Sequence, residues 1–165
     1  MINVNDFINT VHQETIDTAR IPIPVGEYVG QIGTDDKALT LEQGNAGPNA
    51  KNPGAPWARL DVLINIPDPS GAIKAATGRD PVSTRYGIML DLTAAGMPDF
   101  TAGKNLNLGR LFKAIGHAVT DKGQIAAPWS FTELPGKGIK ITIAHDPNPN
   151  DASAPYERVA NITAA

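Results

Sequence analysis

Basic side chains gather in one part of this chain, residues 101–145. The segment holds six Lys and Arg residues against two acidic residues, whereas residues 1–50 hold two cations and seven carboxylates. The whole chain has a formal net charge of −3, so its charge is sorted along the sequence rather than evenly mixed. Clustered Lys and Arg side chains neutralise phosphates in proteins that bind nucleic acid. Segment 101–145 is therefore the candidate for contact with a polyanion.

The clearest predicted helix lies inside this basic segment. Its apolar residues follow the spacing i, i+3, i+4 and i+7, which places them on one helical face: Leu108, Leu111, Phe112 and Ile115. Either Asn105 or Asn107 is expected to cap the first turn with its side-chain oxygen, and Gly116 is expected to end the helix. The pattern predicts an amphipathic helix that packs its apolar face against a core.

The opposite face of this helix carries Arg110, Lys113 and His117, and Lys104 precedes it. Two interpretations fit these residues. They form either the solvated side of an ordinary amphipathic helix or a patch that faces phosphates. The second interpretation predicts that Lys104, Arg110 and Lys113 contact the backbone of a nucleic acid.

A second chemical arrangement comes from the predicted strand over residues 57–66. Leu60, Val62 and their alternate neighbours form an apolar inner face, which leaves Trp57 and Arg59 together on the outer face. A flat aromatic ring beside a cation is what an unpaired base needs for stacking. The alternative is that Trp57 only covers the edge of a sheet.

Further strands are predicted where apolar and polar residues alternate, and these runs are separated by stretches rich in Gly, Pro and Asn. They cover residues 25–32, 84–92, 139–143 and 156–162. In the last of them, Tyr156, Arg158 and Ile162 are expected on one side and Val159 on the other. Together with one or two helices, these runs predict a mainly β protein.

Several stretches are predicted without regular structure. Residues 33–56 and 67–71 are interpreted as loops, with residues 43–56 as a mobile loop, because Asn, Asp, Gly and Pro are frequent there, and a turn is expected at Asp80-Pro81. Residues 1–20 are expected to form either a flexible arm or a short helix capped by Asn5. Residues 21–165 are then long enough for a single domain with a sizeable core.

Composition excludes some classes of site and gives no support to others. The chain has no cysteine, which excludes disulfides and thiolate metal ligands. Its three histidines, His12, His117 and His145, lack ligand spacing, and no nucleophile motif accompanies the His145-Asp146 pair. Aspartates are not rare in strands, so Asp61 and Asp91 do not indicate catalysis by a pair of carboxylates. We therefore expect that the protein is not an enzyme and that it binds no cofactor or metal. We also expect no membrane span and no secretion signal.

A set of short motifs in this order resembles the single-stranded DNA-binding proteins of tailed bacteriophages. The motifs lie within residues 22–165. They are Pro-x-Gly-x-Tyr at 24–28, Gly-Lys-Asn-x-x-Leu-Gly-Arg-Leu at 103–111, Gly-Lys-x-x-Lys-Ile at 136–141 and Tyr-x-x-Val at 156–159. The resemblance implies an OB-fold, a five-stranded Greek-key barrel, here with one helix inserted between the third and fourth strands. It also departs from a pattern common in cellular relatives, because the chain ends in Asn-Ile-Thr-Ala-Ala rather than in an acidic tail.

The resemblance implies sequence-independent binding and coating of single-stranded DNA during replication or recombination. Such binding needs cations and aromatic side chains from several elements. The predicted DNA-binding residues are Trp57, Arg59, Arg85, Tyr86, Lys104, Arg110, Lys113, Trp129, Lys137 and Lys140. Expected partners are single-stranded DNA and replication or recombination proteins of the phage, in the cytoplasm of the infected bacterium. The oligomeric state stays open, with a homo-oligomer as one alternative. A rival class is a virion structural protein, such as a capsid decoration or tail component.

Overall fold

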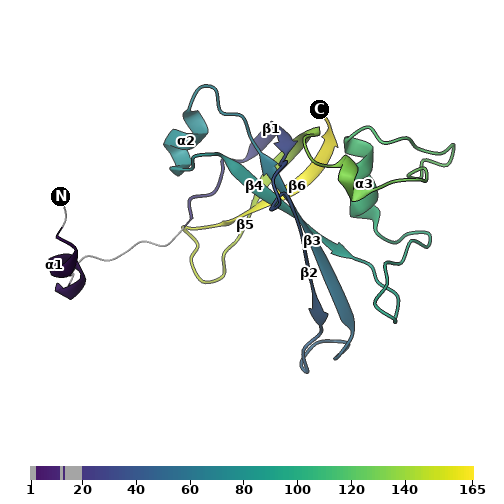
Figure 1. Ribbon diagram of the computed structural model, residues 1–165, viewed down its shortest axis with the longest axis horizontal. Coiled ribbons are helices and arrows are strands. Elements are labelled where there is room, and N and C mark those ends of the chain that lie inside the picture. The colour runs from purple at the N-terminus through teal and green to yellow at the C-terminus, as the bar shows by residue number, and fades with distance from the viewer. Residues whose placement is uncertain (1–2, 12, 14–19) are drawn as a thin grey trace.

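A computed structural model describes residues 3–11, 13 and 20–165, and its architecture is mainly β (Figure 1). Six antiparallel strands form one sheet. The strands are β1 (Gly26–Ile32), β2 (Leu39–Asn45), β3 (Pro56–Asn65), β4 (Ser83–Leu90), β5 (Gly138–Asp146) and β6 (Tyr156–Ala164). The helices are α1 (Val4–Asn9), α2 (Ala72–Thr77), α3 (Leu106–Ala114) and the short 3-10 helix η1 (Phe131–Glu133). The predicted fold class is confirmed at this level.

Strand β3 organises the sheet because it pairs with three other strands. One edge of β3 pairs with β4, and the other pairs first with β2 and then, at Ile64, with the end of β1. The sheet continues from β1 through β5 to β6. Gly30 allows the close approach of β1, since a Cβ there would lie 2.6 Å from Cγ2 of Ile64. A larger residue at position 30 would push the two strands apart.

The core lies on the inner face of the curved sheet, as the alternating patterns predict. Leu60, Val62 and Ile64 of β3 are buried there, and β5 contributes its three isoleucines. Helix α3 packs Leu108, Leu111 and Phe112 into the same core, so the helix predicted from the 3.6-residue period is confirmed. Removing this apolar surface from water is the main stabilising contribution to the fold.

The sequence-based interpretation of residues 33–56 as a loop is wrong, because β2 lies there. Leu39 and Leu41 alternate with Thr40 and Glu42, and the strand pairs with β3 from Leu39 opposite Val62 to Asn45 opposite Pro56. Only residues 46–55 form the tip of this hairpin, which is closed by a hydrogen bond of 2.8 Å from the Ala46 amide to the Ala55 carbonyl. Residues 72–82, where the sequence predicted only a turn at Asp80-Pro81, contain the short helix α2.

The sidedness predicted for the last strand is also wrong. Val159 and Ile162 are both buried on the core side. A register shift between Thr142 and Ile143 of β5 lets residue 160 bulge out of the ladder, so two residues three positions apart point the same way. A strict two-residue alternation cannot anticipate a bulge.

The sheet is open between β4 and β6, so the predicted five-stranded Greek-key barrel is not confirmed. Side chains nevertheless bridge these two strands. The guanidinium of Arg79, which precedes β4, and the carboxylate of Glu157 on β6 are 2.8 Å apart, and each side chain is about a tenth exposed. Glu157 also accepts hydrogen bonds from the Thr84 hydroxyl and, at 2.7 Å, from the Ile23 amide. Burial favours a higher pKa for Glu157, but the bonds from Arg79, Thr84 and Ile23 together hold its pKa below the usual value.

Of the two alternatives for residues 1–20, the structure has the short helix, α1, which is drawn apart from the sheet in Figure 1. Its cap is Asn3 rather than the predicted Asn5. The Asn3 side chain accepts hydrogen bonds from the amides of Asn5 and Asp6 at 3.1 and 3.3 Å. His12 lies outside the described residues.

Candidate nucleic-acid interface

Nine of the ten residues predicted to bind DNA fall into three groups in the structure, and Tyr86 stands apart. Trp57, Arg59 and Arg85 lie on the outer face of β3 and β4. Lys104, Arg110, Lys113 and Trp129 surround a pocket beside α3. Lys137 and Lys140 belong to the turn before β5 and to β5 itself. Tyr86 belongs to β4 but faces inward, where it packs partly against the core.

On the outer face, the Trp57 ring is supported by its neighbour on β2. A Cβ on Gly44 would lie 3.1 Å from Cε2 and Cζ2 of Trp57, so the ring lies directly over this glycine. The ring is half-buried by this contact. Met89 of β4 is 59% exposed on the same face. The face thus carries exposed apolar surface at Met89 beside the half-buried Trp57 ring.

Arg59 on this face is already engaged by a carboxylate. Its Nε and terminal nitrogen donate to one oxygen of Asp61 at 3.0 and 2.7 Å. The pair lies over Gly87 of β4, where a Cβ would be 2.9 Å from the Arg59 Nε. Glu42 of β2 stands opposite Arg59 in the ladder. The carboxylates of Asp61 and Glu42 therefore offset the positive charge of Arg59, on which base stacking at this face was predicted to depend. Arg85 is the other exposed cation on this face.

The pocket beside α3 has a different electrostatic character. Its volume is about 450 Å³, and Lys104, Arg110 and Lys113 line it together with the rings of Phe100 and Trp129. None of the described residues that line the pocket is Asp or Glu. This is the surface on which the structure brings predicted cations and a predicted aromatic residue together.

Helix α3 positions two of the cations. Because Leu108, Leu111 and Phe112 point into the core, Arg110 and Lys113 are left exposed on the other side, as predicted. Gly116, with a φ of 83°, ends the helix as expected, since few other residues tolerate that conformation. His117, predicted on the same face as these cations, instead turns back toward the Phe112 ring.

Asn105 fixes where α3 begins, although not by the predicted cap. Its side chain makes no capping hydrogen bond, and its backbone is left-handed with a φ of 50°. Asn105 Nδ2 instead donates to the carbonyls of Asp91 and Asp99 at 3.0 and 2.8 Å, and its Oδ1 accepts from the Asp91 amide at 3.0 Å. Asn105 is buried. These bonds tie the first turn of α3 to the end of β4 and so place Lys104 at the pocket.

The aromatic wall of the pocket is a cluster built around Trp129. Its ring lies edge-on to Phe100, Phe112 and Phe131, with centroid distances of 5.4, 5.0 and 5.5 Å. Phe112 is fully buried, whereas Phe100 is 59% exposed. A cluster anchored in the core and open at one side presents a firm aromatic surface to the pocket.

The loop that carries Trp129 is held by His117. Its Nδ1 lies 2.6 Å from a Glu133 carboxylate oxygen, and its Nε2 lies 2.7 Å from the Ala126 carbonyl. The bond to the Ala126 carbonyl, followed by that to Glu133, raises the pKa of His117, while the bond from His117 lowers the pKa of Glu133. The protonated imidazole, which donates from both nitrogens, is thereby favoured.

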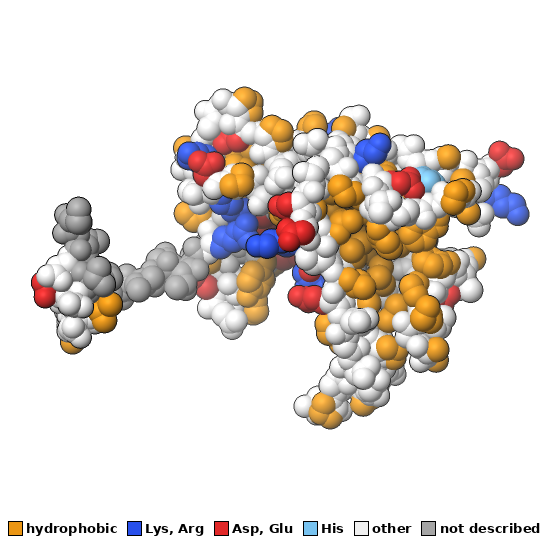
Figure 2. Space-filling view, viewed as in Figure 1, with side chains coloured by type: hydrophobic (Ala, Val, Ile, Leu, Met, Phe, Trp, Pro, Cys, Tyr) orange, Lys and Arg blue, Asp and Glu red, His pale blue; other side chains and the backbone are white. Residues whose placement is uncertain are grey.

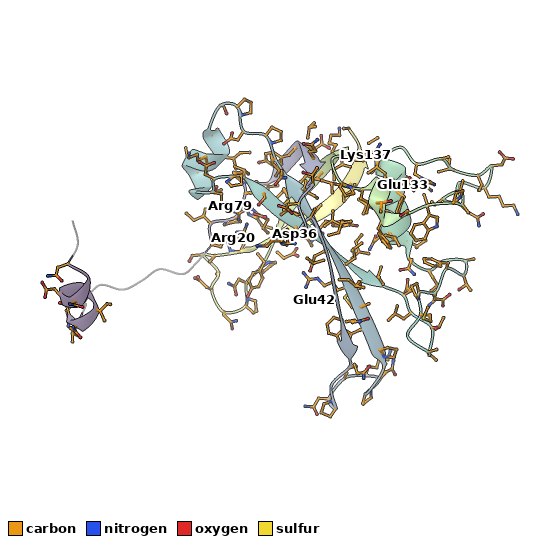
Figure 3. All side chains as sticks on the ribbon, viewed as in Figure 1. Arg20, Asp36, Glu42, Arg79, Glu133 and Lys137 are labelled. Atoms are coloured by element: carbon orange, nitrogen blue, oxygen red, sulfur yellow. The ribbon has the colours of Figure 1, made fainter. Side chains whose placement is uncertain are left out.

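The remaining predicted residues have other neighbours. Burial raises the pKa of the Tyr86 hydroxyl, and the positive charge of Arg110 partly opposes this rise. Lys140 lies 3.7 Å from Glu27 on β1. Lys137 lies close to Glu133 (Figure 3). Lys137 and Lys140 are therefore not brought to the pocket.

Sequence reasoning did not single out Phe100 or Gln124, which also line the pocket. Phe100 is one of the aromatic residues of the chain, but the sequence around it does not predict whether its ring is exposed or buried in the core. Gln124 lies in a turn next to Gly123. The side chain of Lys113 extends to this turn, since a Cβ on Gly123 would be 3.9 Å from Lys113 Nζ. No sequence signal marks this approach.

The part of the chain that the structure describes contains neither a cluster of metal ligands nor a membrane-spanning helix. No three His, Asp or Glu side chains there come together in a way that could hold a metal ion. None of the described helices has the length and apolar composition needed to span a bilayer. No protein-family model matches the chain, and a search of curated protein sequences returns no match.

Proposed function

We propose that this protein binds single-stranded DNA without sequence preference, and that the pocket beside α3 is a principal contact surface. The observation that carries the proposal is the pocket lining, which combines three cations, two exposed or half-exposed aromatic rings and no carboxylate among its described residues. Single-stranded nucleic acid is bound in this way, with cations along the phosphates and rings stacked on the bases.

The arrangement suits a flexible strand rather than a duplex. Arg110 and Lys113 project from one side of α3, and Lys104 stands at its start. Phe100 and Trp129 line the same pocket. A single strand can turn its bases toward the rings while its phosphates face the cations, and every base has a stacking face. This accounts for binding that is independent of sequence.

The order of strand pairing supports an OB-fold as the finer description of the sheet. β1 and β2 occupy successive positions along one path, pairing with β5 and with β3 respectively. They correspond together to the long first strand of that fold, and α3 then falls between the third and fourth strands. The Arg79–Glu157 bridge lies at the seam where such a barrel would close. OB-folds commonly bind oligonucleotides.

The biological setting of the proposal rests on the resemblance to bacteriophage single-stranded DNA-binding proteins. In that setting the protein coats DNA during replication or recombination in the cytoplasm of an infected bacterium, and it acts by shielding the strand rather than by catalysis. Net acidity is compatible with this role, because local potential rather than total charge governs phosphate contacts.

The test is a fluorescence titration with poly-dT at several salt concentrations. The triple variant Lys104→Ala, Arg110→Ala, Lys113→Ala is compared with a control of equal charge change, Lys37→Ala, Lys51→Ala, Lys74→Ala. If all three pocket cations contact phosphates, the slope of log affinity against log salt should become less steep by about 2, at ~0.7 per phosphate. The control should keep the wild-type slope. An unchanged slope in the pocket variant would reject the pocket as the phosphate contact.

A further inference from the structure

Leu41 of β2 lies on the inner face of the sheet but is not covered by the core. It pairs with Leu60, and Leu60 pairs with Ile88, so all three side chains point to the same face. Leu60 and Ile88 are buried, whereas Leu41 is 57% exposed. Figure 1 shows the β2–β3 hairpin extending away from the rest of the sheet. The inner face of this hairpin therefore keeps apolar surface in water, which is unfavourable.

Leu41 forms part of an apolar groove between the β2–β3 hairpin and the α3 region, called here the hairpin groove. Leu39, Leu90, Phe100 and Phe131 also line it, and its volume is about 290 Å³. Figure 2 shows hydrophobic side chains gathered over this part of the molecule. Sites for small molecules begin at ~300 Å³. The hairpin groove therefore suits a single ring better than a folded segment of protein.

The hairpin groove offers a guest apolar contact rather than charge or side-chain hydrogen bonds. None of the described residues that line it is charged, and its two polar residues are Thr40 and Asn105. Thr40 stands opposite Asp61 in the ladder, with its side chain on the outer face. Asn105 already donates its side-chain amide hydrogens to the carbonyls of Asp91 and Asp99. A phosphate would lose its hydration here without compensation.

The hairpin groove is continuous with the pocket beside α3. Phe100, Asn105 and Leu108 line both of them. The pocket supplies the three cations, whereas the groove supplies apolar surface and the Phe131 ring. A single strand whose phosphates lie at the pocket cations can therefore turn an adjacent base into the groove. This continuity indicates a nucleic-acid base as the occupant.

We propose that the hairpin groove is a base subsite of the single-stranded DNA site and that it favours thymine; this inference rests on the proposed function. The C5–C6 edge of a pyrimidine carries no hydrogen-bonding group, so it can enter the groove while the opposite edge stays in water. Thymine adds a methyl group at C5, which apolar side chains such as Leu41 and Phe131 would contact. The subsite thus creates a preference in base composition without reading a sequence.

Oligonucleotides of dT and dU test the subsite, because their bases differ only in the C5 methyl group. Fluorescence titration uses the shortest length that saturates one protein molecule. The wild type should bind dT about fourfold more tightly for one buried methyl group, at ~0.8 kcal/mol per CH₂ and ~1.4 kcal/mol per tenfold in affinity. Leu41→Thr should bring the ratio close to one. The control Val29→Thr changes a β1 side chain that is 59% exposed and lines neither the pocket nor the groove, so it should keep the wild-type ratio.

The outcomes separate this inference from the proposed function. Equal affinities of the wild type for dT and dU would overturn the subsite and leave DNA binding in place. A preference that persists in Leu41→Thr would also overturn it, because the methyl group would then be bound elsewhere. If the wild type binds neither oligonucleotide, the proposed function fails and the subsite fails with it. Sedimentation without DNA tests a second copy as the occupant, since a dimer that Leu41→Thr dissociates would assign the groove to that copy and overturn the proposal.

Discussion

His117 Nδ1 lies 2.6 Å from a Glu133 carboxylate oxygen, and this pair joins the end of α3 to η1 across the loop that carries Trp129. The second ring nitrogen is bonded to the Ala126 carbonyl in the same loop. One side chain thus holds both flanks of the aromatic wall. The geometry favours a protonated ring, so the stability of this region is expected to depend on pH.

The first prediction follows from the sign of this pKa shift. Because folding raises the pKa of His117, its stabilising contribution is fully present below the unfolded value of about 6.5 and is lost as pH rises through the raised folded value. The lowered pKa of Glu133 means that its own contribution disappears only in acid. Melting temperatures of wild type and His117→Gln should differ most near pH 6 and converge at alkaline pH. A difference that stays constant with pH would contradict the protonated pair.

The second prediction concerns Asn105, whose side chain makes three hydrogen bonds while its backbone is left-handed. Asn105→Ala removes these bonds in a buried position and leaves a residue that disfavours a positive φ. The loss should be about 2–3 kcal/mol at roughly 1 kcal/mol per bond, measured by denaturant unfolding. Asn107→Ala is the control, because the exposed Asn107 side chain bonds only to Arg110. Equal effects of the two changes would contradict the role given to Asn105.

The third prediction distinguishes the pocket from the outer sheet face. The chain has two tryptophans, Trp57 and Trp129, so each single Phe substitution leaves one reporter. The pocket proposal predicts that poly-dT changes the emission of Trp129 in the Trp57→Phe protein more than that of Trp57 in the Trp129→Phe protein. The reverse result would place the bases on the outer face beside Arg59, the interface that the Trp57–Arg59 pattern indicates.

The fourth prediction concerns Phe100, which is exposed and lines the pocket. Phe100→Ala should weaken poly-dT binding roughly ten- to a hundredfold, since stacking contributes about 1–3 kcal/mol per base. Its melting temperature should change little. The control is Met97→Ala, a neighbouring apolar side chain that is 64% exposed and not among the residues that line the pocket. If Phe100→Ala binds as wild type does, the aromatic wall is structural only.

The fifth prediction tests the close approach of β1 to β3. In Gly30→Ala the added methyl group would lie 2.6 Å from Ile64 Cγ2 and 3.1 Å from the Asn65 carbonyl oxygen. Overpacking of this kind costs about 1–3 kcal/mol. Gly47→Ala, where no atom lies within 4 Å of the new carbon, should be close to neutral. Equal stability of the two variants in urea unfolding would show that the strands separate easily.

Much of the fold follows from local sequence pattern. The alternation of apolar residues in β3 and β5 and the 3.6-residue period of α3 predict which side chains are buried. Each pattern arises because one helix or strand packs one of its faces against the core, so it can be recognised within a short stretch of sequence. The pattern in Leu39–Glu42 is of the same kind, and β2 could have been predicted from it had the surrounding Gly, Asn and Pro not suggested a loop. The pairing of Arg59 with Asp61 was likewise accessible, because residues two apart on a strand share a face.

The candidate site depends on tertiary structure. Phe100, Lys104 and Trp129 come from loops without periodicity, and contacts between distant residues, such as Asn105 with Asp91 and His117 with Glu133, hold these loops in place. The bulge that turns both Val159 and Ile162 inward also depends on the partner strand. Local sequence patterns indicate which residues can be buried and where positive charge is concentrated, since these are properties of neighbouring residues. Which loops surround one pocket was decided by the packing of the whole sheet, because contacts between distant segments leave no local pattern.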